Sequence, residues 1–564
     1  MRKAILVLVV LLAAAGLVFA SGGQEKGTAA GGVQLNPPGT YPVTKAPYTF
    51  TAVTGYYSIE SSGKPNDSKF SKWFEQLTNV KVNFIDTIEG AAAAEKINLL
   101  LASGDLPDAF MTVNYINVQQ AYLYGSQGTF IPLNKLIDER MPGLKKDFAE
   151  YPQYRKQLTA PDGNIYAMPY LEAGCFHCSM SNKFWVYKPW LDKLGLKNPE
   201  TTDDMYKMLV AFRTRDPNGN GQADEIPMVG STSWNANPLT FLMDAFIYAN
   251  TGNFMQMDKG AVTFVANKPE WREGLKYIAK LYKEGLIAKE SFVYKEDQAR
   301  ALVENPTVAL VGSFPAGWYG VATSNGGGTG RFADFQPISP IAGPTGLRQA
   351  MFNEQPCNPH TIITKNAKNP EVIAQAMDWF FTPPFEIKVD MPWDFGQEGV
   401  TWRYATDAEK KTLVSRDGLP AVTMPVGVQK EYGKEKYDDG WTRSQPRWGF
   451  RDFGGMPVEW QTDPSKQEWR LMVATRDLML PFKVVKSMPP NLVFQAAIQN
   501  EFTDLRTAIA GGTGVVMNWT TEFIVGTRNI NDDGAWQAYL AELKKAGVDR
   551  YEKIWTDTVK AAGY

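Results

Sequence analysis

The chain has 564 residues, a formal net charge of −2 and a hydrophobic fraction of 44%, and these values exclude several classes of protein. A charge close to zero argues against a nucleic-acid-binding protein, which normally carries a basic excess. The hydrophobic and charged fractions are those of a globular chain, which excludes extended disorder. Only two histidines, His177 and His360, are present, so a histidine-based metal centre or catalytic dyad has little support.

The first 20 residues have the pattern of a secretory signal peptide. Arg2 and Lys3 give a basic start, an apolar run follows, and the segment ends in VFA at positions 18–20, with small residues where a signal peptidase reads. The apolar run is about 15 residues long, shorter than the ~20 that a spanning helix needs. We therefore expect cleavage after Ala20. No cysteine follows the run, so we expect no lipid anchor, and residues 21–47 form a flexible leader.

Strands and helices are predicted to alternate from residue 48 onwards. Strands are expected over residues 48–54, 80–85 and 108–113, with helices over residues 68–77 and 91–102. This alternation implies a parallel sheet with helical crossovers. Ligands bind beyond the carboxyl ends of such strands, so Asn114, which follows the third strand, is a candidate contact. The alternative is that Asn114 is an ordinary turn residue.

Further elements are predicted along the rest of the chain. Strands are expected over residues 163–169 and 307–311, and helices over residues 189–194, 201–215, 269–284, 370–381 and 535–546. In the helix over 201–215, apolar residues recur at i, i+3, i+4 and i+7, so that stripe faces the core. No glycine-rich phosphate-binding motif follows a predicted strand, which leaves nucleotide binding without support.

The three cysteines of the chain are Cys175, Cys178 and Cys357. The first two form the motif CFHC, which is compatible with a redox pair or with part of a zinc site. A zinc site needs more ligands than this motif supplies, and no thioredoxin-like pattern surrounds it. A structural role is therefore favoured, either as buried thiols or as a local disulfide, and Cys357 is unpaired by count.

A calcium-type loop is the sharpest local motif. In the segment DPNGNGQADEIP, residues 216–227, oxygen-bearing side chains occupy positions 1, 3, 5 and 9 and glycine occupies position 6. These are the positions by which a 12-residue loop wraps Ca²⁺, with position 7 giving a backbone carbonyl. Pro227 replaces the usual bidentate glutamate, and Glu225 can supply the missing carboxylate. We predict a structural Ca²⁺ site, the alternative being a metal-free Asx/Gly turn. The predicted ligands are Asp216, Asn218, Asn220, Gln222, Asp224 and Glu225.

Several segments, in chain order, resemble bacterial extracellular solute-binding proteins of family 1, and most closely the large LplA-type branch related to alginate-oligosaccharide binders. They are LASGDLPD (101–108), DGNIYAMP (162–169), WLDKLGL (190–196), DPNGNGQADEIP (216–227), WDFGQEGVTW (393–402) and a WxxYxxxLxxxG ending (536–547). The resemblance spans roughly residues 48–564. It implies an α/β, two-lobe periplasmic-binding-protein fold with a hinge and an interlobe cleft that closes on a carbohydrate. The closed receptor then docks on the permease subunits of an ABC transporter in the inner membrane.

The resemblance also implies a division of the chain. The N-terminal lobe would comprise residues 48–170 plus about 308–368. The C-terminal lobe would comprise about 171–307 plus 369–564 and contain the calcium loop, which matches the family's own. The family often carries a lipid-anchored cysteine that this chain lacks, so we expect a free, monomeric periplasmic protein that is not an enzyme.

Candidate sugar contacts follow from the chemistry of carbohydrates. Sugars present apolar C–H faces and a rim of hydroxyls, so aromatic platforms with carboxylate and amide partners suit them. Such residues occur in loops and after predicted strands. Each aromatic could equally be a core residue, and each carboxylate could be exposed or structural. The predicted contacts are Asn114, Glu172, Trp234, Trp318, Tyr319, Trp393, Asp394, Glu398 and Trp402.

Two rival functions remain open at this stage. A secreted glycoside hydrolase needs two carboxylates about 5–9 Å apart, and Asp394 and Glu398 could take those roles. A peptide or other-solute receptor is possible on the same fold, because a fold does not fix its ligand. We favour an oligosaccharide receptor that performs no covalent step and holds structural Ca²⁺. The identity of the sugar cannot be read from the sequence.

Overall fold

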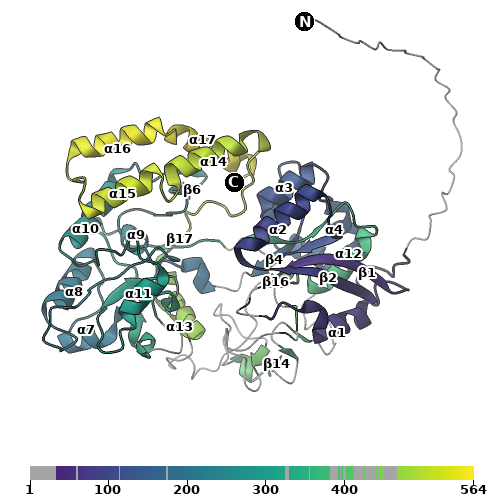
Figure 1. The fold of residues 1–564 in the computed structure, drawn as a ribbon, viewed down its shortest axis with the longest axis horizontal. Coiled ribbons are helices and arrows are strands. Elements are labelled where there is room, and N and C mark those ends of the chain that lie inside the picture. Colours follow the sequence, from purple (N-terminus) through teal and green to yellow (C-terminus); the bar gives the residue numbers. More distant parts are fainter. Residues whose placement is uncertain are drawn as a thin grey trace, which may run out of the picture.

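The computed structural model describes residues 33–381, apart from 57, 59–60, 113–114, 173–175, 324–328 and 355, and residues 467–564. Between these ranges it describes short stretches, namely 392–393, 396–397, 402–411, 423–425, 438, 440–441 and 444–449. Two lobes lie side by side and are joined by crossing segments (Figure 1). No helix among the described residues is long and apolar enough to cross a membrane.

The N-terminal lobe is built on a mixed sheet with the strand order β16-β4-β11-β3-β1-β2. The predicted parallel part is confirmed, because β1 (Tyr48–Gly55) pairs in parallel with β2 (Val80–Ile88) and with β3 (Ala109–Met111). A later strand, β11 (Cys357–Ile363), inserts antiparallel between β3 and β4 (Met168–Glu172). The edge strand β16 (Arg447–Gly449) pairs in parallel with β4.

Helices cover both faces of this sheet. Side chains alternate along β1, so that Phe50 belongs to one core cluster and Val53 to another on the opposite face. Ser68 caps the first crossover helix by accepting a hydrogen bond from the backbone of Ser71, and Gly104 ends the second in the left-handed conformation. The helices are α1 (Lys69–Thr78), α2 (Gly90–Ser103), α3 (Val118–Ser126), α4 (Asn134–Arg140), α5 (Pro142–Glu150), α6 (Pro152–Leu158) and α12 (Pro370–Met377).

The C-terminal lobe surrounds a short antiparallel sheet, β8-β5-β9, and a hairpin of β6 and β7. These strands are β5 (Phe184–Tyr187), β6 (Met255–Asp258), β7 (Ala261–Phe264), β8 (Ser313–Pro315) and β9 (Phe335–Pro337). The helices are α7 (Lys188–Leu194), α8 (Thr202–Thr214), α9 (Pro238–Met243), α10 (Pro269–Lys283), α11 (Glu296–Val303), α13 (Gln467–Ala474), α14 (Gln499–Ala510), α15 (Val515–Val525), α16 (Asp533–Lys545) and α17 (Val548–Ala561). The predicted apolar stripe of α8 is buried, as are the inward residues of α10.

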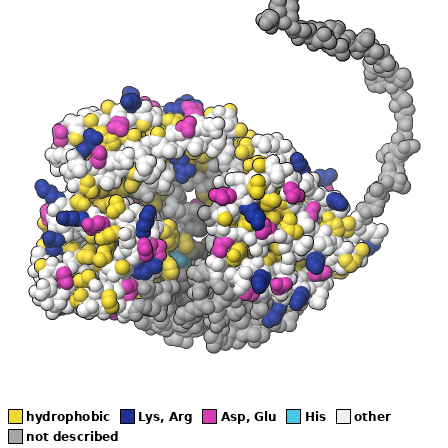
Figure 2. All heavy atoms as spheres, viewed as in Figure 1, with side chains coloured by type: hydrophobic (Ala, Val, Ile, Leu, Met, Phe, Trp, Pro, Cys, Tyr) yellow, Lys and Arg dark blue, Asp and Glu magenta, His cyan; other side chains and the backbone are white. Residues whose placement is uncertain are grey.

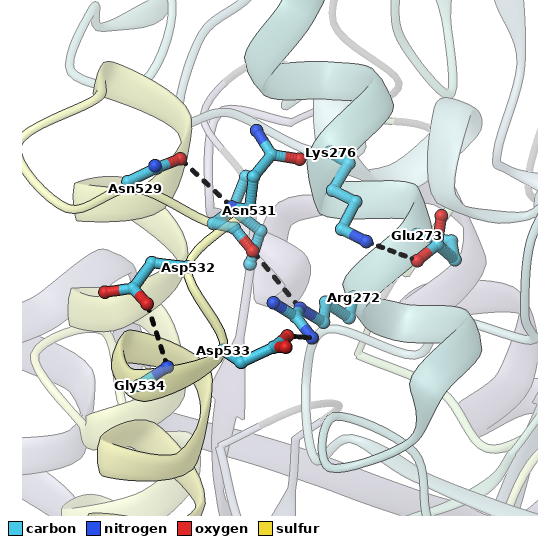
Figure 3. Close-up of polar contacts among 9 residues, drawn as sticks. Arg272, Glu273, Lys276, Asn529, Asn531, Asp532, Asp533 and Gly534 are labelled. Atoms are coloured by element: carbon cyan, nitrogen blue, oxygen red, sulfur yellow. Dashed lines mark hydrogen bonds and ion pairs between the residues drawn. The ribbon is translucent and has the colours of Figure 1, made fainter.

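An arginine of α10 holds the turn between α15 and α16 against the rest of this lobe. Arg272 donates from Nε to the carbonyl oxygen of Ile530 over 3.1 Å and from Nη1 to a carboxylate oxygen of Asp533 over 2.7 Å (Figure 3). Its guanidinium lies 5.6 Å from the ring centroid of Trp536. These contacts join the C-terminal helices to α10, although Arg272 and Ile530 are 258 residues apart along the chain.

The chain passes between the lobes after β4, after β10 (Ala350–Met351) and after β16. The strand β17 (Lys483–Val484) pairs in parallel with β10 at this joint. Beyond β17, the chain reaches the N-terminal lobe, where Gln119 exchanges two hydrogen bonds with the backbone of Phe494.

The expected boundaries are wrong in three places. Residues 33–47, expected as part of a flexible leader, pack on the N-terminal lobe, where Val43 is fully buried in the core and its N–H donates to the carbonyl oxygen of Thr78. Residues about 308–368 were expected in the N-terminal lobe, but the buried apolar residues of 311–322 and 332–341 belong to the core of the C-terminal lobe. Residues from Val372 to Phe381 belong to the N-terminal lobe core, although 369–564 was assigned to the other lobe. The reason is that β8 and β9 pair with β5, whereas β11, which follows them along the chain, pairs in the first sheet.

Two predicted strands also differ from the structure. The strand expected over residues 163–169 forms instead as β4 (Met168–Glu172), several residues further along. Residues 307–311 form no strand, and Val311 makes only an isolated parallel bridge with Ile226. Whether a segment forms a strand depends on the distant strand that pairs with it. An apolar run alone does not specify that partner.

Candidate functional site

The ends of two strands meet the crossing segments and so define where a ligand can contact both lobes. The strand β4 ends at Glu172, directly before the chain leaves the N-terminal lobe. The strand β8 runs antiparallel to β5, and its last residue, Pro315, lies opposite Phe184, where the chain enters the C-terminal lobe. Residues that follow β8 therefore lie at the edge of the C-terminal lobe that faces its neighbour. Figure 2 shows the molecule hollowed between the lobes.

Two indole rings flank the glycine turn that follows β8. The ring of Trp234 covers Gly317, where a Cβ would lie 2.9 Å from it, and the ring of Trp318 covers Gly320, where a Cβ would lie 2.6 Å from it. Glycine is needed at both positions because any side chain would displace the indole. Trp234 is 48% exposed, and Trp318 is half-buried. The Nε1 of Trp318 is buried and has no hydrogen-bond partner among the described residues.

Tyr319 differs from its neighbour Trp318. It is fully buried, with its ring edge-on to Trp185 at 5.0 Å and stacked on Phe332 at 6.2 Å between centroids. Arg470 of α13 lies 5.6 Å from the same ring and donates to the carbonyl oxygens of Ala333 and Phe335. This tyrosine is a core residue, and the prediction of a ligand contact for it has no support.

The remaining predicted contacts are only partly within the described residues. Asn114, Asp394 and Glu398 lie outside them. Three others have a described backbone but no described side chain: Glu172 ends β4, Trp393 lies on β12 (Pro392–Trp393) and Trp402 lies on β14 (Trp402–Tyr404). Their contacts with a ligand stay predictions.

The calcium-type loop folds around its own side chains. Asp216 accepts hydrogen bonds from the backbone N–H groups of Gly219, Asn220 and Gly221 over 2.9 to 3.1 Å. Gly219 and Gly221 adopt φ values of +75° and +73°, which favour glycine. The side-chain amides of Asn218 and Asn220 both donate to the carboxylate of Asp224, over 2.8 and 2.9 Å. The side-chain oxygens of the two asparagines accept hydrogen bonds from the backbone N–H groups of Asn220 and Gln222, so the loop is closed by its own side chains.

Glu225 is the loop residue whose environment most favours a bound cation. Its side chain is buried, and no side chain among the described residues donates a hydrogen bond to its carboxylate. Burial raises the pKa of this carboxyl above its usual range, and the nearby Asp216 and Asp224 add to the shift. A buried carboxylate without a side-chain partner is costly, and a metal ion would compensate it. Gln222 contributes no side-chain contact, consistent with a role through its backbone carbonyl.

The loop is remote from the indole pair. It follows α8. Its far end is fixed by a hydrogen bond from the backbone N–H of Ile226 to the carbonyl oxygen of Leu310, three residues before β8 begins at Ser313. Trp318 follows the opposite end of β8. Lys193 of α7 donates to the carbonyl oxygens of Asp216 and Pro217, a contact that the sequence did not reveal because only a helix was predicted there. The loop therefore supports the lobe rather than the ligand.

No cluster of three or more histidine, cysteine, aspartate or glutamate side chains that could hold a metal is found in the described part of the chain. The three carboxylates of the calcium-type loop, those of Asp216, Asp224 and Glu225, do not form such a cluster in this structure. Among the cysteines, Cys178 is disulfide-bonded and Cys357 is a buried free thiol. A disulfide at Cys178 is one of the two structural forms expected, and its structural role stays a prediction because an oxidised redox pair forms the same bond.

Two α/β lobes joined by crossing segments are the architecture of a solute-binding protein. The chain belongs to the bacterial extracellular solute-binding protein family, whose model matches residues 58–386. The fructooligosaccharide ABC transporter substrate-binding protein FusA of Streptococcus pneumoniae is 34% identical over 327 residues. That match covers 57% of this chain and 58% of the relative, so the chain spans little more than half the length of this relative.

Solved structures extend the likeness to the whole fold. The structure of S. pneumoniae FusA in complex with kestose has a TM-score of 0.66 and 26% identity and covers 91% of this chain and 99% of its own. A FusA EF-hand mutant in complex with fructo-nystose has the same TM-score and 25% identity, with the same coverage. An extracellular solute-binding protein from Bifidobacterium longum subsp. infantis has a TM-score of 0.71 at 22% identity and covers 92% and 99%, which shows the fold alone.

Proposed function

We propose that this protein is a receptor that binds an oligosaccharide between its two lobes and delivers it, chemically unchanged, to the permease of an ABC transporter. The observation that carries the proposal is the pair of indoles, Trp234 and Trp318, on the edge of the C-terminal lobe that faces the N-terminal lobe. Indole faces stack on the C–H faces of sugar rings. The similarity to FusA makes fructooligosaccharides the first ligands to test.

The mechanism is lobe closure. Open and closed states of such proteins differ by a few kcal/mol, and a ligand that contacts both lobes only when they are closed shifts the population towards closure. No bond is formed or broken, so no catalytic residue is assigned. The receptor acts outside the cytoplasm, as a monomer in the periplasm after export, and presents the closed form to the permease.

The indoles are tested by isothermal titration with kestose. Trp318→Ala and Trp234→Ala should each weaken binding about tenfold, which corresponds to ~1.4 kcal/mol, while their melting temperatures show that both variants fold. The matched control is Leu99→Ala, which removes an exposed apolar side chain of α2 in the other lobe. Unchanged affinity in both tryptophan variants would contradict the assignment.

Whether the sugar is cleaved distinguishes a receptor from the rival function, a glycoside hydrolase. Chromatography after overnight incubation should return the oligosaccharide at its original length. Release of shorter sugars at a rate proportional to protein concentration would make the protein an enzyme instead of a receptor.

We further propose that the loop from Asp216 to Glu225 holds a structural Ca²⁺. Two features support it: the convergence of Asn218 and Asn220 on Asp224 and the buried carboxylate of Glu225, to which no side chain among the described residues donates. A cation there would take the place of the amide N–H groups as the partner of Asp224. Bound Ca²⁺ supplies a multivalent positive charge that ties α8 to the start of β8.

Calcium is tested by thermal melting. Saturating Ca²⁺ at 100 times its dissociation constant should add ~2.7 kcal/mol to the free energy of unfolding, and a chelator should reverse the gain. Glu225→Gln should remove most of this gain, while the control Asp203→Asn, an exposed carboxylate in the first turn of α8, should leave it intact. A calcium response of equal size in Glu225→Gln would argue against the site.

A further inference from the structure

A cavity lies at the joint between the lobes, away from the indole pair. Its volume is about 300 Å³, at the lower end of the range for small-molecule sites. Trp555 of α17 lines it, and α17 lies above β17 in Figure 1. Trp318 and Tyr319 instead lie by α13, whose Arg470 contacts Tyr319, and α13 is below β17 in the same view. The cavity is therefore separate from the proposed oligosaccharide site.

Contacts from both lobes surround this cavity. Gln119 of α3 donates to the carbonyl oxygen of Phe494 over 3.0 Å and accepts from its N–H over 2.8 Å, and Phe494 lines the cavity. Lys156 of α6 donates to the carbonyl oxygen of Gly563 over 2.8 Å and lies 3.6 Å from the ring centroid of Tyr564. The cavity is thus held by the N-terminal lobe as well as by α17, and a molecule inside it contacts the joint itself.

The one ionisable side chain that lines the cavity is Glu354. It is half-buried, in the segment that leads into β11, and it makes no hydrogen bond or ion pair with any residue that the structure describes. A carboxylate withdrawn from water without a counter-charge is destabilising, so a cation in the cavity would be favoured. The aromatic walls, Phe494 and Trp555, also attract cations through their ring faces.

The neutral polar groups of the cavity wall suit hydroxyl groups. Asn250 and Asn253 accept hydrogen bonds from the backbone of Gly252 and Met255 through their side-chain oxygens, both over 2.9 Å, which leaves their N–H donors for a ligand. Asn491 uses its N–H on the carbonyl oxygen of Cys357 and so retains an acceptor oxygen. Trp555 is 8% exposed, and its ring lies edge-on to Tyr551 at 6.3 Å between centroids.

We propose that this cavity is a second binding site, for a small amine that also carries hydroxyl groups, as an amino sugar does. Glu354 pairs with the ammonium group, the asparagine side chains bind the hydroxyls, and Phe494 and Trp555 contact the apolar face. Because the site contacts both lobes at the joint, its occupant biases the angle between them. The proposal needs no covalent step.

The test compares two probes of nearly equal shape, glucosamine and glucose, by isothermal titration of the full chain. Glucosamine at neutral pH should bind with a stoichiometry of one, and glucose at the same concentration should not bind this site. Glu354→Gln should weaken glucosamine binding at least tenfold, whereas Glu354→Asp, which keeps the charge, should retain part of it. Trp318→Ala should leave the glucosamine affinity within about twofold of that of the unmodified protein.

Four results would overturn the proposal, three of them from the comparison of probes and variants. These three are equal binding of glucose and glucosamine, unchanged glucosamine affinity in Glu354→Gln, and loss of glucosamine binding in Trp318→Ala, which would place the amine in the oligosaccharide site. Absence of glucosamine binding at millimolar concentration would also overturn it. The probe comparison uses the unmodified protein, so it decides the matter even where a variant does not fold. Failure of kestose to bind would count against the receptor function alone.

Discussion

Burial changes the pKa of a carboxyl group in the C-terminal lobe, that of Asp244. Asp244 follows α9 in the C-terminal lobe and is 4% exposed. It accepts a hydrogen bond from the side-chain amide of Asn182 over 2.9 Å and one from the backbone of Ala249 over 3.3 Å. These two contacts do not offset the loss of water, and burial raises the pKa of Asp244 to about 7.

The raised pKa makes the stability of the protein depend on pH. In unfolded chains the pKa of an aspartate is ~3.9, so between about pH 4 and pH 7 the folded state holds a proton that the unfolded state has released. The free energy of unfolding therefore falls as the pH rises through this window, by up to ~1.4 kcal/mol per pH unit, and is level above it. Asp244→Asn should remove this slope.

Urea unfolding at several pH values between 4.5 and 8 measures the effect. The difference in unfolding free energy between Asp244→Asn and the unmodified protein should grow as the pH rises towards 7 and then stay constant. The control Asp203→Asn changes an exposed carboxylate and should give a difference that does not vary in this way. A pH-independent difference for Asp244→Asn would show that the carboxyl is ionised throughout.

The candidate site shows how far single residues can be predicted from sequence. Trp318 and Tyr319 are adjacent aromatics with the same predicted role, yet one lies over Gly320 at the lobe edge and the other is packed between Trp185 and Phe332. Sequence spacing cannot separate them because both follow the same strand. The turn of the calcium-type loop was predictable because its geometry is local, with Asp216 accepting from the backbone N–H groups of Gly219, Asn220 and Gly221, and its binding of Ca²⁺ stays a proposal.

At the scale of elements, the turn between α15 and α16 depends on one arginine. Arg272 has an exposed side-chain fraction of 14%, whereas its partner Asp533 has 89%. An ion pair with so exposed a partner contributes little, typically 0–1 kcal/mol. The hydrogen bond to the carbonyl oxygen of Ile530 and the contact with Trp536 therefore carry most of the stabilisation.

Variants of Arg272 and Asp533 should therefore differ in their effect on stability. Arg272→Leu should lower the free energy of unfolding by about 1–3 kcal/mol, because a charge-assisted hydrogen bond to the backbone is lost. Asp533→Asn should change it by less than about 0.5 kcal/mol. Denaturant titration of both variants measures the two effects. Equal losses in the two variants would mean that the ion pair, and not the backbone contact, holds the turn.

Helices were more predictable than strands in this chain. The helix over residues 201–215 forms as α8, with its predicted apolar stripe buried and Thr201 in a capping box with Asp204, because both signals are local. The predicted strand over 307–311 fails because its apolar run lies beside the calcium-type loop and pairs only at Val311. A strand exists only where a partner is available, and the partner is set by the whole fold.

At the scale of the molecule, the lobe boundaries depend on pairings between distant segments. The strand β11 lies between β3 and β4, although about 185 residues separate it from β4 along the chain. No local pattern marks that insertion, so the expected division misplaced residues 311–322, 332–341 and 372–381. The two-lobe architecture was predictable because the ordered motifs of the family span the chain, and the family assignment is confirmed.

The central claim is that the lobes close on an oligosaccharide without altering it. Small-angle X-ray scattering of the full chain, recorded as kestose is added, measures this claim most directly when the sugar is recovered and analysed afterwards. The account predicts a radius of gyration that decreases to a plateau at one sugar per protein molecule, with the sugar returned intact. A radius of gyration that stays constant while the sugar binds, or a sugar returned as shorter fragments, would contradict it.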